Sequence, residues 1–157
     1  MVRKPFAAFG HVLYGNYYES GYTVEATTSA DSKTVLMFSD GDLTVRDKHT
    51  GAVVDQCVPG WIRYGEYENR SIVVTANADS VSWCYDPVVN QGRTPEITLF
   101  KLSQGESATL VAGENLFLCK GTLLVNGNQF VGPYQIVVKT EGNTALAVTD
   151  IYGLLFK

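Results

Sequence analysis

The sequence has little charge and few of the side chains that most catalytic and metal sites use. Charged residues make up 18% of the 157 residues, whereas an average soluble domain has about 25%. The net charge is −4, with 12 Lys and Arg against 16 Asp and Glu. This balance provides no basic field for nucleic acid or an anionic membrane, so we expect neither as a partner.

Histidine and cysteine are also scarce. The two histidines, His11 and His49, lie far apart in the sequence, and we predict neither as a metal ligand. The cysteines Cys57, Cys84 and Cys119 are odd in number, lie in apolar runs and form no CxxC pair. We therefore predict buried, unreactive thiols in place of a disulfide or metal site, and no cofactor.

Long apolar runs are missing too. No run approaches the roughly 18 apolar residues that a membrane span needs. Near the N-terminus, Pro5, Gly10, His11 and Gly15 interrupt the apolar stretch before the core of a secretory signal forms. We expect a chain that is made and kept in a cytosol, or carried in a particle assembled there.

The apolar residues that are present follow the pattern of an all-β protein. No window sustains the i, i+3, i+4, i+7 pattern of an amphipathic helix. From Tyr22 onward, short runs rich in Val, Ile, Leu, Thr and aromatic residues recur about every ten residues, separated by Gly, Asn, Asp and Pro. Strands are predicted near 23–28, 34–38, 42–46, 52–58, 61–64, 71–76, 81–85, 96–102, 107–112, 115–119, 122–126, 134–139, 144–149 and 153–157. This arrangement predicts a sandwich, jelly roll or barrel.

The chain also shows an internal repeat. The segments "VLMFSDGDLTVRDKHTGAVVDQCVPG" and "NLFLCKGTLLVNGNQFVGPYQIVV" share an order of apolar strand, Gly turn, second strand, polar turn and Pro-Gly or Gly-Pro corner. We predict two similar β halves, residues 23–90 and 91–157, preceded by an extended aromatic arm, residues 1–22. The predicted arm contacts, on the body or on a neighbouring subunit, are Phe9, Tyr14, Tyr17, Tyr18 and Tyr22.

Residues 105–156 carry a family resemblance. The stretch "GESATLVAGENLFLCKGTLLVNGNQFVG" resembles the first motif and hairpin of the cupins, and Glu114 and Gly121 match its Glu and closing Gly. The resemblance implies a small double-stranded β-helix, or jelly roll. Metal-dependent cupins carry two His before that Glu and one in a second motif, but this chain has "SATL" at 107–110 and no His in "YQIVVKTEGN". We expect a cupin-like body without the metal-binding histidines, Glu114 as a turn residue with a backbone hydrogen bond, and a type I′ turn at Asn126 and Gly127.

One aromatic and polar group stands out, in "PGWIRYGEYENR" at 59–70. Its members Trp61, Arg63, Tyr64 and Tyr67 form a candidate rim for a protein interface or a ligand such as a glycan. The alternative is that Trp61 plugs the end of the sandwich and the tyrosines cover it.

The first hypothesis is a non-enzymatic structural or interaction protein. Chemically quiet all-β sequences of this kind resemble accessory proteins of bacteriophage particles, such as capsid decoration or tail proteins. This predicts a virion location, a homo-oligomer with a trimer favoured, and other proteins of the assembly as partners. The alternative is a metal-free cupin that binds a carbohydrate or other small molecule, with isomerase or epimerase activity from Tyr and Glu side chains such as Glu66, Glu68 and Glu114. A host-directed inhibitor is a third hypothesis.

Overall fold

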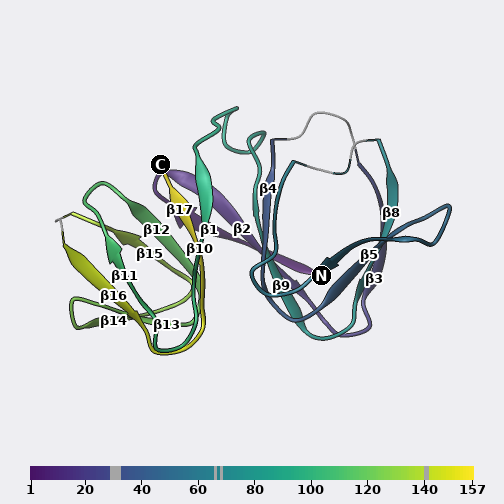
Figure 1. Cartoon of the computed structure of the whole chain (residues 1–157). Helices are drawn as coiled ribbons and strands as arrows, with labels where there is room; N and C mark the ends of the chain where they lie inside the picture. Colours follow the sequence, from purple (N-terminus) through teal and green to yellow (C-terminus); the bar gives the residue numbers. More distant parts are fainter. Residues whose placement is uncertain (29–32, 66, 68, 140–141) are drawn as a thin grey trace. The chain divides into compact units, whose positions relative to one another are not determined.

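The computed structural model describes residues 1–28, 33–65, 67, 69–139 and 142–157 (Figure 1). Within these ranges the chain is all-β. The strands of its first part are β1 (Val2–Ala8), β2 (His11–Tyr18), β3 (Thr23–Thr27), β4 (Val35–Asp40), β5 (Leu43–Asp47), β6 (Val53–Cys57), β7 (Ile62–Tyr64), β8 (Ser71–Ala76) and β9 (Ser80–Tyr85). The strands of its second part are β10 (Ile97–Leu102), β11 (Ser107–Leu110), β12 (Asn115–Lys120), β13 (Thr122–Val125), β14 (Asn128–Val131), β15 (Tyr134–Val137), β16 (Asn143–Ala147) and β17 (Ile151–Phe156).

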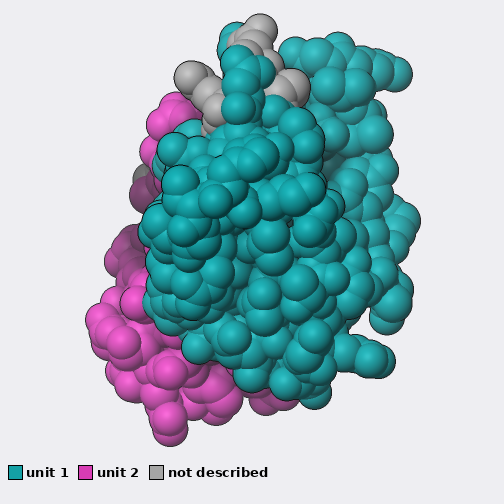
Figure 2. Space-filling model, turned by 90° about the vertical axis from the view of Figure 1, so that its right-hand side faces the viewer, with its two compact units in different colours: residues 1–6, 12–93 teal, residues 7–11, 94–157 magenta. Residues whose placement is uncertain are grey.

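The strands form two compact units (Figure 2). Each unit contains two sheets. Unit 1 comprises residues 1–6 and 12–93, with sheet A in the order β1-β2-β9-β4-β7 and sheet B in the order β3-β8-β5-β6. Unit 2 comprises residues 7–11 and 94–157, with sheet C in the order β10-β17-β12-β15 and sheet D in the order β11-β16-β13-β14. No helix among the described residues has the length and apolarity needed to cross a membrane.

The two units repeat one topology, as the sequence pattern predicts. The order β2-β9-β4-β7 in unit 1 returns as β10-β17-β12-β15 in unit 2, and β3-β8-β5-β6 returns as β11-β16-β13-β14. Strand β1 has no counterpart and extends sheet A at its edge. All-β sheets with this repeated order confirm the predicted fold class, a cupin-like jelly roll built from two similar halves.

The repeat extends to single residues. The β4–β9 ladder shifts register between Phe38 and Asp40, and the β12–β17 ladder shifts between Leu118 and Lys120, in each case one residue before a glycine. These glycines, Gly41 and Gly121, have φ values of 89° and 106°. An added Cβ would lie 2.3 Å from a backbone oxygen of the strand connection that faces it, in both units. The turn that ends β4 and β12 therefore requires glycine.

The structure corrects the prediction of an extended arm at residues 1–22. Residues 2–18 form a β-hairpin that belongs to sheet A. Strand β1 pairs with β2, and β2 continues sheet A by pairing with β9, with Asn16 opposite Ser82. The chain turns at Phe9 and Gly10, both with positive φ. The many aromatic residues hid a regular alternation in "HVLYGNYY", whose even-numbered residues Tyr14, Asn16 and Tyr18 share one face.

Three local predictions are confirmed. Asn126 and Gly127 have φ values of 48° and 81° and connect β13 to β14 as a two-residue hairpin. The Glu114 carboxylate accepts a hydrogen bond from the backbone N–H of Val111 at 3.1 Å. All three cysteines are buried free thiols.

Candidate functional site

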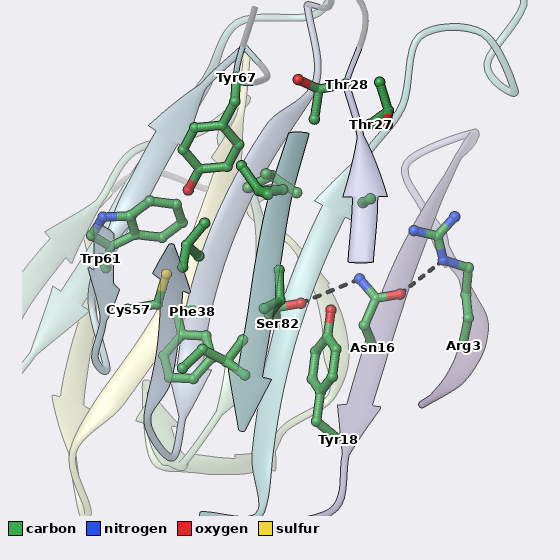
Figure 3. A pocket seen from close by; sticks show the side chains of 16 residues that line it. Arg3, Asn16, Tyr18, Thr27, Thr28, Phe38, Cys57, Trp61, Tyr67 and Ser82 are labelled. Atoms are coloured by element: carbon green, nitrogen blue, oxygen red, sulfur yellow. Dashed lines mark hydrogen bonds between the residues drawn. The ribbon is translucent and has the colours of Figure 1, made fainter. Parts of the chain in front are cut away.

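A cavity of about 310 Å³ lies between the two sheets of unit 1. That volume is at the lower end of the range for small-molecule sites. Figure 3 shows Arg3, Asn16 and Ser82 toward one side of it, together with Tyr18, and Trp61 and Tyr67 toward the other. Its aromatic lining residues are Tyr18, Phe38, Trp61 and Tyr67, and its polar ones are Arg3, Asn16, Thr27, Thr28, Cys57 and Ser82.

The polar side of the cavity is a connected row on sheet A. Asn16 on β2 lies directly opposite Ser82 on β9, and the Asn16 Nδ2 donates a hydrogen bond to the Ser82 Oγ at 3.3 Å. The Arg3 Nε, on the neighbouring strand β1, donates to the Asn16 Oδ1 at 2.8 Å. Asn16 is only 3% exposed, so both ends of its amide need these partners.

Tyr18 extends this row. It lies two residues beyond Asn16 on the same face of β2. Burial raises the pKa of the Tyr18 phenol above its ordinary value, although Ser82 and Arg3 oppose the shift. The ring also contacts Tyr22, with centroids 6.0 Å apart.

The opposite end of the cavity is closed by an aromatic and ionic cluster. The Arg63 guanidinium lies over the Tyr67 ring, 4.1 Å from its centroid, and pairs with the Asp55 carboxylate at 3.3 Å. Burial, and then a hydrogen bond to Asp55, raise the pKa of Tyr67 far above its ordinary value. Trp61 packs against the same apolar cluster as Tyr67. At this end the Arg63 charge is therefore paired with that of Asp55.

Cys57 also lines the cavity, as a protonated thiol. Burial, together with the nearby carboxylates of Asp55 and Asp42, raises its pKa to about 12. Because a thiol needs to ionise to act as a nucleophile, Cys57 contributes packing and not covalent chemistry at neutral pH.

Taken together, the titratable groups lining the cavity hold their protons near neutral pH. Tyr18, Cys57 and Tyr67 all have raised pKa values. Among the described lining residues, Arg3 is the single cation and no carboxylate or imidazole is present. The described lining residues therefore offer hydrogen-bond donors, aromatic surface and one fixed positive charge.

The cavity does not suit the metal that the cupin resemblance brings to mind. Within the described ranges, no group of three or more His, Cys, Asp or Glu side chains is placed to hold a metal ion. His11 stacks near Phe156 in unit 2, with ring centroids 6.0 Å apart, and His49 lies in the exposed turn between β5 and β6. The oxygen donors in the cavity are neutral amides and hydroxyls, a poor set for a transition metal.

The structure separates the four predicted rim residues. Trp61 and Tyr67 line the cavity, and Arg63 stacks behind Tyr67. Tyr64 is 60% exposed and does not line the cavity, because it follows Arg63 on β7 and points to the other face. Of the glutamates named for acid and base chemistry, Glu66 and Glu68 lie outside the described residues, and Glu114 belongs to a turn of unit 2.

The five aromatic residues assigned to the arm also have different surroundings. Tyr18 lines the cavity, and Tyr22 packs against the apolar cluster of unit 1. Tyr14 lies beneath the Arg3 guanidinium and Tyr17 beneath the Lys4 ammonium, each with the cation 4.9 Å from the ring centroid. Phe9 belongs to unit 2, where its ring lies 5.5 Å from that of Phe156.

Sequence reasoning missed three polar residues of the site: Arg3, Asn16 and Ser82. Asn16 and Ser82 alternate with apolar or aromatic neighbours in strands that are otherwise buried, which is the signal that was available. That signal does not reveal their pairing, because 66 residues separate them in the chain. Arg3, next to Lys4 at the N-terminus, carries no sequence signal beyond its charge.

Comparison with known proteins supports the fold and no family. No protein-family model matches the chain, and no curated protein matches it. Among solved structures, the chain is similar to YhaK from Escherichia coli, with a TM-score of 0.53 and 15% identity over 99% of this chain and 92% of that one. It is also similar to the bacterial pirin YhhW from E. coli, in complex with nickel(II), with a TM-score of 0.51 and 14% identity over 92% and 80%. AerE from Microcystis aeruginosa has a TM-score of 0.50 and 13% identity over 99% and 97%.

These similarities, together with the repeated topology, define the class of the protein. The chain has a cupin-like fold of two jelly-roll units. One of these units contains a cavity lined by neutral and cationic groups.

Proposed function

We propose that this protein binds a small molecule, without catalysing a reaction, in the cavity between the sheets of unit 1. The observation that carries the proposal is the cavity of about 310 Å³ with aromatic side chains on one side and a row of hydrogen-bonding groups on the other. Apolar walls with a few polar groups in fixed places are typical of ligand sites.

The character of the lining favours binding over catalysis. General acid and base catalysis needs a group that exchanges its proton near the working pH. In this cavity the phenols and the thiol have raised pKa values, and the Asp55 carboxylate is engaged by Arg63 and Tyr67. This supports the second of the sequence hypotheses, a metal-free cupin that binds a small molecule, in its non-catalytic form.

The two tryptophans provide a test that reports from the site. Trp61 lines the cavity, whereas Trp83 is 1% exposed, donates to the Ser39 hydroxyl at 2.9 Å and lies outside the lining. We expect a ligand, sought among sugars, nucleosides and small carboxylic acids and amides, to change the tryptophan fluorescence and to raise the melting temperature. In Trp61→Phe the fluorescence change should disappear.

A matched pair of variants on β3 locates the binding. Ala26 lines the cavity on an exposed strand, so Ala26→Phe should obstruct the cavity and abolish the shift in melting temperature. Thr23→Phe places the same side chain at an exposed position of that strand outside the lining and should leave binding intact. Silence across the whole panel, or equal binding by both variants, would contradict the proposal.

The structural role expected first from the sequence stays a prediction. No similarity to a phage particle protein accompanies the fold similarities reported above. The homo-oligomer, the partner proteins and the virion location are likewise untested, and the oligomeric state by light scattering is the measurement that addresses them.

A further inference from the structure

We propose that the ligand of the unit 1 cavity is a small carboxylate with an aromatic or other apolar body, and that Arg3 binds its carboxylate group. This inference rests on the proposed function and specifies it. Three features carry it: the orientation of Arg3, its charge relative to the rest of the cavity, and the aromatic lining.

Arg3 is held in place through its Nε, and its two terminal nitrogens are available to a ligand. Its Nε donates to the buried Asn16 Oδ1 at 2.8 Å, and its guanidinium lies over the Tyr14 ring, 4.9 Å from the centroid. Among the residues that the structure describes, no carboxylate pairs with it. In Figure 3 its two terminal nitrogens point away from Asn16, toward the end of the cavity where Thr27 and Thr28 lie.

The orientation of Arg3 depends on the buried side chain of Asn16. Asn16 is 3% exposed, and its Nδ2 is held by the Ser82 hydroxyl at 3.3 Å. The order Ser82, Asn16, Arg3 crosses the adjacent strands β9, β2 and β1, so the orientation of the guanidinium is set by the sheet. An arginine fixed in this way loses little side-chain entropy when it binds a ligand.

The charge of the cavity selects the anion. A guanidinium with its terminal nitrogens available matches the two oxygens of a carboxylate in a planar, bidentate arrangement. Arg3 supplies one positive charge, and it is the sole cation among the described lining residues. One charge balances a carboxylate, whereas a phosphate dianion would be left half neutralised.

The rest of the lining selects an apolar body. Phe38, Trp61 and Tyr67 present ring surface, and Leu36, Val45 and Ile72 add aliphatic surface. Aromatic rings favour offset or edge-to-face contact with another ring. A body rich in hydroxyl groups would find few partners there, because the Tyr67 hydroxyl is already hydrogen-bonded to Asp55.

Matched acids and amides test the inference with the full chain. The probes are benzoate, cinnamate and 2-naphthoate, each with its carboxamide, which has nearly the same shape and no charge. We expect calorimetry at low ionic strength to give an affinity about tenfold higher for at least one acid than for its amide. Added salt should weaken binding of the acid and leave the amide unchanged.

Two charge-removing variants on β1 assign the effect to Arg3. Arg3→Gln should lower the affinity for the acid about tenfold and leave the affinity for the amide unchanged. Lys4→Gln removes the same charge from the next residue, whose ammonium lies over Tyr17 on the other face, and should change neither affinity.

The outcomes separate this inference from the proposed function. Acid and amide binding equally well, an unaltered acid affinity in Arg3→Gln, or silence of all three pairs would overturn the carboxylate inference. If a sugar or nucleoside still gives a Trp61-dependent signal in those cases, the cavity binds a ligand of another class and the proposed function stands. If the whole panel is also silent, both are wrong.

Discussion

Unit 1 and unit 2 place different side chains at equivalent positions of the same sheets. The ladders align Asn16, Ser82 and Phe38 across sheet A of unit 1, and Phe100, Gly153 and Leu118 across sheet C of unit 2. In unit 2 the Phe100 ring belongs to the apolar core, and Gly153 has a tightly packed backbone. In unit 1 an amide and a hydroxyl occupy those places, and a cavity remains.

The same contrast holds at two further positions. Tyr18 corresponds to Leu102, since Tyr18 lies two residues after Asn16 on β2 and Leu102 lies two residues after Phe100 on β10. Arg63 on β7 lies opposite Leu36 of β4, and Ile136 on β15 lies opposite Leu116 of β12. Arg63 therefore corresponds to Ile136. Unit 2 places apolar side chains at these sites, and both Leu102 and Ile136 are buried in its core. The comparison teaches that one strand plan can line its interior with apolar or with polar side chains according to a few inward positions.

The largest effect is expected from moving the polar residue of unit 1 into unit 2. Phe100→Asn removes a ring from the apolar core and buries an amide without partners, which should cost about 5 kcal/mol of unfolding free energy. Chemical denaturation measures it. The reciprocal change Asn16→Phe should cost much less, because the cavity has room for the ring, and should abolish ligand binding. Equal losses in the two variants would contradict the contrast between the units.

The second effect tests what the units share. Gly121→Ala would place a Cβ 2.3 Å from the Asp150 carbonyl oxygen at a positive φ, and we expect a loss of about 3 kcal/mol or more. Gly41→Ala should cost a similar amount, because its Cβ would meet the Asp79 oxygen at the same distance. Gly127→Ala is the control, with positive φ but nothing within 4 Å, and about 1 kcal/mol is expected. A loss as small as that of the control at Gly121 or Gly41 would disprove the steric requirement.

The third effect is a pH dependence that compares the buried thiols. Burial raises the pKa of Cys57 from about 9 to about 12. Above pH 9 the unfolded chain loses this proton and the folded chain keeps it, so the unfolding free energy falls as pH rises, by about 1.4 kcal/mol per pH unit until about pH 12. Melting curves of Cys57→Val between pH 8 and 11 should show a shallower decline than those of the unaltered protein.

Cys119 provides the matching case in unit 2. It is 4% exposed, and burial raises its pKa well above the ordinary value. Cys119→Val should flatten the decline by at least as much as Cys57→Val, because Cys57 lies at an open cavity. A larger effect at Cys57 would mean that the thiol beside the cavity is the better shielded of the two, against the contrast drawn here.

The smallest effect concerns surface charge. The ion pair between Lys48 and Glu25 in unit 1 spans 2.9 Å, with side chains 45% and 62% exposed. Lys48→Gln should change the unfolding free energy by less than about 0.5 kcal/mol, since solvent screens such pairs. A loss of more than about 1 kcal/mol by chemical denaturation would show that charge, and not the interior alone, distinguishes unit 1.

Much of the framework was predictable because its signals are local. The hairpin at Asn126 and Gly127 needs two positive φ values that few residue pairs adopt. The Asn-Gly pair therefore predicts this turn from the sequence alone. The segment 107–110, which the resemblance aligns with the cupin histidine positions, forms strand β11 and contains Ser, Ala, Thr and Leu. The hairpin β1–β2 was missed because its aromatic residues are typical both of strands and of surface arms, and only pairing with β9 decides between them.

The candidate site was predictable only in part. Trp61 and Tyr67 attracted notice as large aromatic side chains, and both line the cavity. Tyr64 attracted equal notice and is exposed, because strand alternation places it on the other face from Arg63. Asn16 and Ser82 carry no individual signal, since an inward polar residue is recognised by its partner across the sheet.

By itself the sequence determined most strands after residue 22, the turns, the twofold repeat and the lack of metal-binding histidines, because these depend on residue type and on neighbours a few positions away. The tertiary structure alone decided that residues 2–18 close sheet A and that Asn16 meets Ser82. It also decided that unit 1 keeps a cavity where unit 2 packs Phe100 over Gly153. Those outcomes depend on ladder register between distant strands, which fixes the side chains that share an interior.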